Sequence, residues 1–303
     1  MNPWDAQWPL DDAEAARRIA KAFPQLADQP VRFLSAGWDN HVFRCGDQLL
    51  FRFPRRPVAV DLLRSEAAVL PLLAPHLPAA VPAALHWCPA DSTGQPFAGV
   101  PWIPGQTACR VDPVRLASPQ LAASLGTFLR ALHHIPVQDA LARAIPDDRY
   151  GRTHLPRRCE VVDEHTDTLA RLLGPRSTEV RAMLHSWKHS PIPTARSVIH
   201  GDLYARHVLV SKNNELAGVI DWGDLHLGCP ALDLAVAWSV VPRTTRAAFF
   251  SAYGPTDPHT LRLARFQALY HACRTLVYAD DIADEPLLRA SHRAIASVLD
   301  DPA

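Results

Sequence analysis

The chain has 303 residues, of which 48% are hydrophobic, so it can bury a substantial core and is long enough for two domains or lobes. Lysine and arginine together number 31, as do aspartate and glutamate, which argues against a charged surface for nucleic acid or a membrane. No stretch approaches the roughly 20 apolar residues of a membrane span.

The six cysteines lie far apart without a CxxC pair, which favours free thiols in a reducing compartment over disulfides or a zinc site. The opening residues MNPWDAQWPLDDAEAARRIA lack the cationic and then apolar pattern of a signal peptide. We therefore expect a cytoplasmic monomer that binds neither nucleic acid nor a membrane.

The first third of the chain is predicted to be rich in strands. Residues 13–23 begin with acids and end with a base, as expected of a helix. Two β-prone runs, HVFRCG and LLFRFP, flank Gly46-Asp47, which predicts a hairpin. Residues 58–77 are apolar at helical spacing, and residues 97–106 form a short extended run that ends in a Pro/Gly turn.

Beyond residue 106 most of the chain has helical periodicity. Residues 119–136 carry large apolar side chains along one face. Further helical runs are predicted at about 160–188, 231–252, 257–279 and 286–299. Between them HVLV and AGVID flank the turn SKNNE, which predicts one small hairpin. We therefore predict an α+β protein with a small strand-rich N-lobe, residues 1–105, and a larger, mostly helical C-lobe, residues 106–303.

This second hairpin contains the densest polar chemistry in the chain. The run HGDLYARH places Asp202 at the start of a loop and His207 five residues later, and Asp221 follows the next apolar run in DWG. Protein kinases use H-R-D-x-x-x-x-N and then D-F-G. One carboxylate faces the acceptor hydroxyl there, and the other holds Mg²⁺. The joint spacing predicts a kinase-like site, although either aspartate alone could be a turn or cap residue.

The segment VIHGDLYARHVLVSKNNELAGVIDWGDLHLGCPALDLA resembles the signature region of the aminoglycoside phosphotransferase family, kinase-like enzymes that phosphorylate small-molecule hydroxyls. LGTFLRALHHIP resembles the helix before that region, and the resemblance covers roughly residues 30–280. It implies a two-lobed protein-kinase-like fold, with Asp202 as the catalytic base and Asp221 as the principal Mg²⁺ ligand. It also implies that His200 organises the loop and that Asp233 is a buried acid supporting it. A hydrogen-bonded structural histidine is the alternative for His200.

His207 departs from most of this family, which has asparagine at that position, and resembles the histidine of macrolide phosphotransferases. Three roles are open for it: a direct Mg²⁺ ligand, a hydrogen-bond partner of a metal-bound water or phosphate, or packing beneath the loop. Cys229 stands where the family often has aspartate, and a thiol cannot supply that charge.

The N-lobe is expected to bind the nucleotide. SAGWDNHVF stands where a phosphate-facing loop is expected, but Gly37 is its only glycine, and an ordinary hairpin turn is the alternative. None of the three lysines lies in the next strand, so Arg52 is expected to contact the phosphates, with the two arginines of FPRR as competitors. Glu66 would pair with Arg52, unless it is a surface residue.

The hinge between the lobes is expected at VPWIPG, where backbone groups of Pro101, Trp102 and Ile103 would meet the purine. These features together predict an enzyme that uses Mg²⁺ to transfer the γ-phosphate of ATP or GTP to a hydroxyl of a small molecule.

The acceptor expected from the resemblance is an antibiotic, a macrolide or an aminoglycoside, with resistance as the outcome. Balanced charge does not favour a polycationic aminoglycoside, although YADDIADEPLL (278–288) is an acidic cluster that could bind one or simply be solvated. Two alternatives remain. One is a metabolite kinase of the same fold, acting on a sugar, amino alcohol or homoserine-like hydroxyl; the other is a nucleotide-binding pseudokinase.

Overall fold

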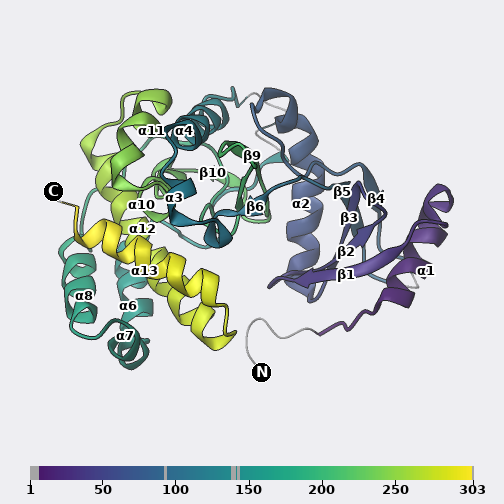
Figure 1. Ribbon diagram of the computed structural model, residues 1–303, viewed down its shortest axis with the longest axis horizontal. Coiled ribbons are helices and arrows are strands. Elements are labelled where there is room, and N and C mark those ends of the chain that lie inside the picture. Colours follow the sequence, from purple (N-terminus) through teal and green to yellow (C-terminus); the bar gives the residue numbers. More distant parts are fainter. Residues whose placement is uncertain (1–6, 92–93, 138–140, 142–143, 302–303) are drawn as a thin grey trace. The chain divides into compact units, whose positions relative to one another are not determined.

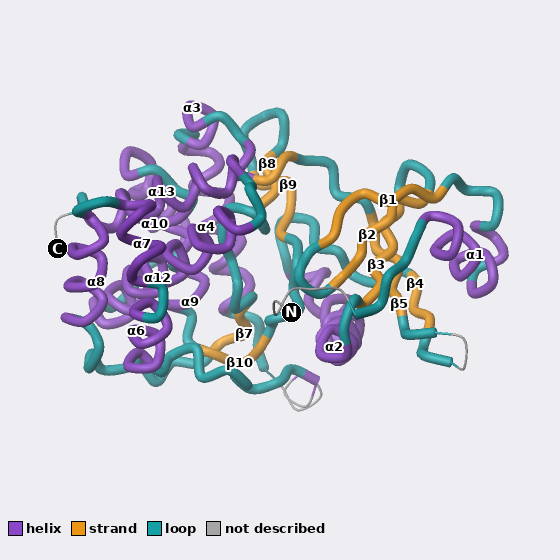
Figure 2. The backbone as a smooth tube through the Cα atoms, turned by 90° about the horizontal axis from the view of Figure 1, so that it is seen from below, coloured by secondary structure: helices purple, strands orange, loops and turns teal. Residues whose placement is uncertain are grey.

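The computed structural model describes residues 7–91, 94–137, 141 and 144–301, and they divide into two compact units. The smaller unit contains the chain up to Pro75, Val81–Ile103 and Asp221–Asp224; the larger contains His76–Ala80, Pro104–Ile220 and the chain from Leu225 onward. Strands dominate the smaller unit and helices the larger (Figure 2). The expected α+β class, with a strand-rich part and a mostly helical part, is confirmed.

The smaller unit is built on a five-stranded antiparallel sheet in the order β1-β2-β3-β5-β4 (Figure 1). Its strands are β1 Val31–Ala36, β2 Asn40–Cys45, β3 Leu49–Pro54, β4 His86–Cys88 and β5 Phe97–Pro101. Strands β2 and β3 form the expected hairpin. Gly46 lies in its turn with a φ of 58°, a region that favours glycine, because a Cβ atom is crowded there.

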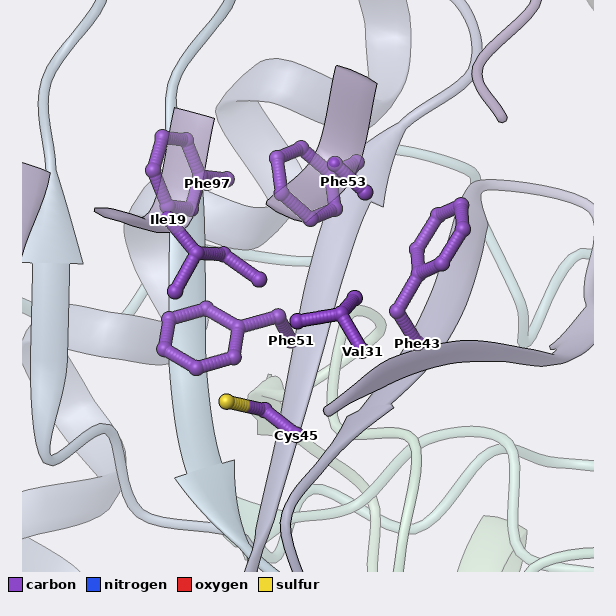
Figure 3. Close-up of a cluster of buried hydrophobic side chains, with 8 residues drawn as sticks. Ile19, Val31, Phe43, Cys45, Phe51, Phe53 and Phe97 are labelled. Atoms are coloured by element: carbon purple, nitrogen blue, oxygen red, sulfur yellow. The ribbon is translucent and has the colours of Figure 1, made fainter. Parts of the chain in front are cut away.

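Two helices, α1 Asp12–Ala22 and α2 Pro57–Leu73, belong to this unit. Because side chains alternate along a strand, Phe51 and Phe53 lie on one face of β3 and pack with Ile19 of α1 (Figure 3). Arg52, between them, lies on the opposite face, where it contacts Glu66 of α2. The pattern LLFRFP therefore places an apolar core on one side of the sheet and a cation on the other.

The larger unit contains a three-stranded sheet in the order β6-β8-β9 and a two-stranded sheet of β7 and β10. The strands are β6 Gln106–Thr107, β7 Ser197–Ile199, β8 Val208–Val210, β9 Leu216–Val219 and β10 His226–Gly228. The sequence predicted the β8–β9 hairpin alone. The other three strands are two or three residues long and pair with distant parts of the chain, so no local periodicity marks them.

Most helices of the larger unit fall in the predicted runs, and two of these runs are divided into shorter helices. The helices of this unit are α3 Pro113–Leu116, α4 Pro119–His133, α6 Leu155–Asp163, α7 Thr166–Leu173, α8 Arg176–Ser186, α9 Ala231–Leu234, α10 Val236–Ser239, α11 Arg246–Tyr253, α12 Pro258–Asp281 and α13 Glu285–Leu299. The run 160–188 is interrupted where Gly174 ends α7 with a φ of 58°. The run 231–252 is interrupted before α11 by Pro242, which lacks the amide hydrogen needed to continue a helix.

Long helices form the centre of this unit, where α12 packs against α13 and α4 packs against α11. A Cβ atom on Gly126 of α4 would lie 2.3 Å from the carbonyl oxygen of Phe249, so this close helix approach requires glycine. No helix among the described residues is long and apolar enough to cross a membrane. All six cysteines fall within the described residues and are free thiols.

Candidate active site

The loop that follows β7 is fixed by a buried aspartate. Asp233 at the start of the α9 region accepts the backbone N–H of His200 on Oδ2 (2.8 Å) and that of Gly201 on Oδ1 (2.9 Å). Gly201 has a φ of 82°, which only glycine adopts readily. Asp233 therefore supports the HGD loop as expected, and the conformation of this loop explains its glycine.

Asp233 remains charged although its side chain is fully buried. Burial raises the pKa of Asp233, but the hydrogen bond and charge of His133 (Nε2 to Oδ2, 3.2 Å) lower it more, so the pKa lies below its usual value. The other ring nitrogen of His133 is 2.9 Å from the hydroxyl of Tyr253, and burial raises the pKa of Tyr253 to about 12. The hydroxyl thus keeps its proton, and the network is satisfied throughout.

His200 holds the loop against the end of β9. Its Nε2 donates to the carbonyl oxygen of Ile220 (3.0 Å), and its Nδ1 accepts the backbone N–H of Asp202 (3.2 Å), which corresponds to a neutral ring. Burial lowers the pKa of His200, and the opposing charge of Asp233 does not overcome this effect. These two contacts tie the loop at Asp202 to the residue that follows β9.

The carboxylate of Asp202 is held ionised and partly exposed. Its Oδ1 accepts a hydrogen bond from Nε2 of His271 (2.8 Å), and its Oδ2 is 3.7 Å from Nδ1 of His207. Burial raises the pKa of Asp202, but the hydrogen bond and charge of His271 and two further imidazoles lower it more, so this pKa lies below its usual value. With 30% of the side chain exposed, the carboxylate can meet a ligand.

His271 was not singled out by the sequence. It lies in the middle of α12, a helix whose position was predicted, but 69 residues separate it from Asp202. The ring of Tyr204 lies 4.7 Å from that of His271 and 4.3 Å from that of His207, so it packs beside both histidines. The local indication in the sequence was a histidine on a largely buried helix. Such a histidine is more often a hydrogen-bonded residue of the core than part of a functional site.

His207 also contacts the HGD loop. Its Nδ1 donates to the carbonyl oxygen of Asp202 (2.7 Å), and its side chain is 7% exposed. Its own carbonyl oxygen accepts the N–H of Ile220 (3.0 Å). With the proton on Nδ1, the lone pair of a neutral ring lies on Nε2, the nitrogen that a metal or a hydrogen-bond donor would use.

In the smaller unit, Arg52 forms an ion pair with Glu66 and lies 3.4 Å from Oδ1 of Asp221. Burial lowers the pKa of Arg52, but the charges of Glu66 and Asp221 raise it more, so the guanidinium stays protonated. The expected pairing with Glu66 is therefore present, and Glu66 is buried rather than on the surface. The charge of Arg52 is fixed in place between two carboxylates.

Asp221 has an unusual backbone. It lies two residues beyond β9, its φ is 64°, and half of its side chain is exposed. Aspartate tolerates this left-handed conformation better than most residues, but the conformation is still uncommon outside glycine. A strained residue that presents a half-exposed carboxylate is a feature of functional sites.

The loop between β1 and β2 differs from a glycine-rich phosphate loop. The N–H of Gly37 donates to the carbonyl oxygen of Asn40 (3.0 Å), and the guanidinium of Arg55 donates to the carbonyl oxygen of Gly37. A Cβ atom on Gly37 would meet open space, so nothing in this fold requires glycine there. Arg56 pairs with Asp39 (2.8 Å), so both competitors of Arg52 are tied to this turn.

The expected hinge residues lie where β5 ends. Pro101 pairs with Leu49 and has no N–H, and the N–H of Trp102 donates to the carbonyl oxygen of Gln48 (2.7 Å). Trp102 also lies under the guanidinium of Arg44, 5.0 Å from the ring centre. Neither Pro101 nor Trp102 therefore has an unengaged N–H.

Asp221 and His207 are the side chains expected to hold Mg²⁺. Among the described residues, no three histidine, cysteine or acidic side chains are grouped to hold a metal ion. Mg²⁺ in kinases is held by one or two carboxylates together with phosphate oxygens and water, so a preformed cluster is not required. Asp221 fits that donor set, and His207 fits it less well because Mg²⁺ prefers oxygen.

A small antiparallel sheet with a buried Arg–Glu pair, together with a helical unit carrying an ordered HGD loop, defines a protein-kinase-like class of phosphotransferase. The family model described as the phosphotransferase enzyme family, APH, matches residues 30–266. This match spans more than half of the chain, so the chain belongs to that family and is a kinase-type phosphotransferase. No curated protein sequence matches the chain.

Solved structures of phosphotransferases share the fold. The GDP complex of aminoglycoside 2'-phosphotransferase-IIIa is 22% identical with a TM-score of 0.71, covering 96% of this chain and 99% of that one. An apoenzyme of macrolide 2'-phosphotransferase from Brachybacterium faecium is 23% identical with a TM-score of 0.65, covering 97% and 99%. Spectinomycin phosphotransferase with ADP and spectinomycin is 13% identical with a TM-score of 0.72, covering 96% and 100%. At these identities the likeness shows the fold alone.

Proposed function

We propose that this phosphotransferase moves the γ-phosphate of ATP or GTP to a hydroxyl of a small molecule, with Asp202 as the hydroxyl-facing base. The observation that carries the proposal is the state of Asp202. Its carboxylate is ionised, partly exposed and oriented by a 2.8 Å hydrogen bond from His271. Its backbone is fixed through His200, which we propose acts by holding the loop.

The lowered pKa of Asp202 makes its carboxylate a weak base. In a loose phosphoryl-transfer transition state, the attacking hydroxyl oxygen has formed little bond to phosphorus. The hydroxyl therefore does not need a strong base to remove its proton. A carboxylate that accepts a hydrogen bond from the acceptor hydroxyl can orient it in line with the phosphate. With Oδ1 engaged by His271, we propose that Oδ2 receives the hydroxyl hydrogen.

The smaller unit is proposed to bind the nucleotide. The protonated guanidinium of Arg52, held by Glu66, would contact the phosphates, and Ile103 would offer its N–H to the purine. Asp221, with His207, would hold Mg²⁺, which when bound neutralises charge on the phosphates. Related structures were solved with GDP or with ADP, which supports a purine nucleotide without choosing between ATP and GTP.

The acceptor proposed from the family is an antibiotic. Related structures are described as complexes with kanamycin and with spectinomycin, and others as macrolide 2'-phosphotransferases. The histidine at position 207 supports a macrolide within that set. Phosphorylation of the drug would then confer resistance, as first expected.

A second candidate, a metabolite kinase, is favoured by the pairing of the acidic residues in 278–288. Asp280 binds Arg171 (2.5 Å), and Asp284 lies 3.1 Å from Arg206 of the catalytic loop and 3.7 Å from Arg110. Because arginines already neutralise these carboxylates, they do not support a site for a polycationic aminoglycoside. The ionised state of Asp202 argues against a pseudokinase.

A screen for phosphate incorporation tests the proposal. The purified protein is supplied with Mg²⁺ and radiolabelled ATP or GTP and is challenged with macrolides, aminoglycosides and hydroxylated metabolites. Asp202→Asn serves as the matched control, because it keeps the shape of the side chain without its charge. We expect transfer to at least one hydroxyl, with kcat about 10²–10⁴-fold lower in the variant and nucleotide affinity little changed. Transfer at the wild-type rate by Asp202→Asn would disprove the assigned role.

A further inference from the structure

A buried arginine lies near the proposed base. Arg158 of α6 is 9% exposed; its guanidinium donates to Oε1 of Gln267 (2.5 Å) and stacks 4.3 Å over the ring of Tyr270. Within the part of the chain that the structure describes, no carboxylate forms an ion pair with it. Buried charges in proteins are normally paired, because an amide and a ring face compensate only part of the lost hydration.

The charge on Arg158 persists at neutral pH. Burial lowers the pKa of Arg158 to about 10, which still leaves the guanidinium protonated. Asp148 lies close enough to raise that pKa slightly, but its carboxylate binds the side chain of Arg152 (3.2 Å). The positive charge of Arg158 is therefore available to an anion from outside the chain.

A second arginine provides a more accessible approach to the same place. Arg274 of α12 is half-buried, and its guanidinium donates to the hydroxyl of Tyr270 (3.3 Å). The two guanidinium groups thus meet at one tyrosine, one over its ring and the other at its hydroxyl. The charge of Arg274 lowers the pKa of Arg158, so an anion between the two guanidinium groups would relieve a repulsion.

These residues lie beside the proposed base. Gln267, His271 and Arg274 are spaced by four and three residues, so they share one face of α12. At a rise of about 1.5 Å per residue, Gln267 and Arg274 lie about 6 and 4.5 Å along the helix from His271. His271 in turn holds the carboxylate of Asp202. An anion at the arginines would therefore lie within the length of a small metabolite from the base.

We propose that Arg158 and Arg274 bind an anionic group of the acceptor, a carboxylate or a phosphate ester, while Asp202 faces its hydroxyl. The proposal rests on the proposed phosphotransfer and favours its second candidate, a metabolite kinase, over an antibiotic kinase. The substrate class it gives is a hydroxylated small molecule that carries a negative charge. Guanidinium groups bind carboxylate and phosphate oxygens through paired N–H groups, so both sources share this chemistry.

Direct binding is the first test. Inorganic phosphate and acetate are titrated calorimetrically at constant ionic strength into the wild type, Arg274→Gln and Arg262→Gln. Arg262 is an exposed arginine on the same helix and provides the matched control. We expect anion affinity to fall about tenfold to a hundredfold in Arg274→Gln, the loss expected for a hydrogen bond between charged groups, and to stay unchanged in Arg262→Gln. Equal affinity in all three proteins overturns the inference.

Arg158 is buried, so Arg158→Lys is the suitable variant, because it keeps the charge and most of the volume. An ammonium group lacks the planar fork, so affinity for both anions should fall here as well. Unchanged affinity in Arg158→Lys, with unchanged affinity in Arg274→Gln, would remove the site altogether.

Matched acceptors provide the second test and identify the source of the anion. Glycerate is compared with glyceramide, gluconate with gluconamide, and glucose 6-phosphate with glucose, each with labelled ATP and GTP. We expect transfer to the hydroxy acids or to the sugar phosphate, with a raised acceptor KM in Arg274→Gln. Equal transfer to the uncharged partners overturns the inference and leaves the phosphotransfer proposal standing. Anion binding that depends on Arg274, without transfer to any hydroxyl, counts against the phosphotransfer proposal instead.

Discussion

Replacing His271 tests whether the orientation of the Asp202 carboxylate, the proposed base, depends on α12. His271→Ala removes the donor that lies 2.8 Å from Oδ1 of Asp202. A hydrogen bond to a charged group contributes about 1.5–3 kcal/mol. Because 30% of the Asp202 side chain is exposed, water can replace part of that bond, so we expect a loss of about 1–2 kcal/mol in the transition state. This loss corresponds to a kcat about 5- to 30-fold lower.

The same substitution should move the acid side of the pH profile. In the wild type, hydrogen bonding and charge from His271 outweigh burial and hold the pKa of Asp202 below its usual value. Without His271, burial weighs more and the pKa rises. Asp202 is then protonated at a higher pH than in the wild type, so the acid limb of the kcat/KM profile should shift to higher pH.

The assay compares His271→Ala with His271→Gln, in which the amide can still donate a hydrogen bond. Steady-state kinetics with a confirmed acceptor should show a lower kcat for alanine, partial recovery for glutamine and an unchanged nucleotide KM in both. Thermal unfolding controls for damage to α12. Wild-type kcat and pH profile in a folded His271→Ala would refute this account, as would glutamine performing no better than alanine.

Four further substitutions follow from the site. Asp221→Ala should abolish metal-dependent turnover, and full recovery in excess Mg²⁺ would make this carboxylate peripheral. Arg52→Ala should raise the nucleotide KM sharply in a folded protein, and unchanged nucleotide kinetics would move its role to the arginines of FPRR. His207→Asn should retain more activity and Mg²⁺ affinity than His207→Ala; alanine matching the wild type would reduce this histidine to packing. Asp233→Asn should lower the free energy of unfolding by about 3–5 kcal/mol at pH 7. The folded-state pKa of Asp233 lies below the ordinary 3.8, so the stability that its charge contributes is fully present above pH 3.8. This contribution is lost as the pH falls through the folded-state pKa. Urea titrations should therefore show that the difference in unfolding free energy between wild type and Asp233→Asn becomes smaller in acid.

Local patterns predicted the features that short stretches of chain can specify. Turn residues between β-prone runs marked the β2–β3 and β8–β9 hairpins, because a hairpin pairs neighbours in sequence. Because the strand LLFRFP contains no lysine, the sequence indicated Arg52 as the cation, and the helical run LLRSEAAVL indicated Glu66 as its partner; the structure contains this ion pair. The stretch that contains Asp202 and Asp221 resembled the family that the family model shows. The resemblance could be seen in the sequence because both aspartates lie in one continuous segment.

Contacts between distant segments could not be predicted in this way. His271 meets Asp202 across 69 residues, and the hydrogen bond between Arg158 and Gln267 spans 109 residues. The acidic run 278–288 was expected to be able to bind a cation, but in the fold two of its carboxylates pair with Arg171, Arg206 and Arg110. Hydrophobic periodicity indicates which face of a helix is buried. It does not indicate which polar group of another segment will contact a residue on that face. That partner is set by how the helices pack, and packing depends on the whole chain at once.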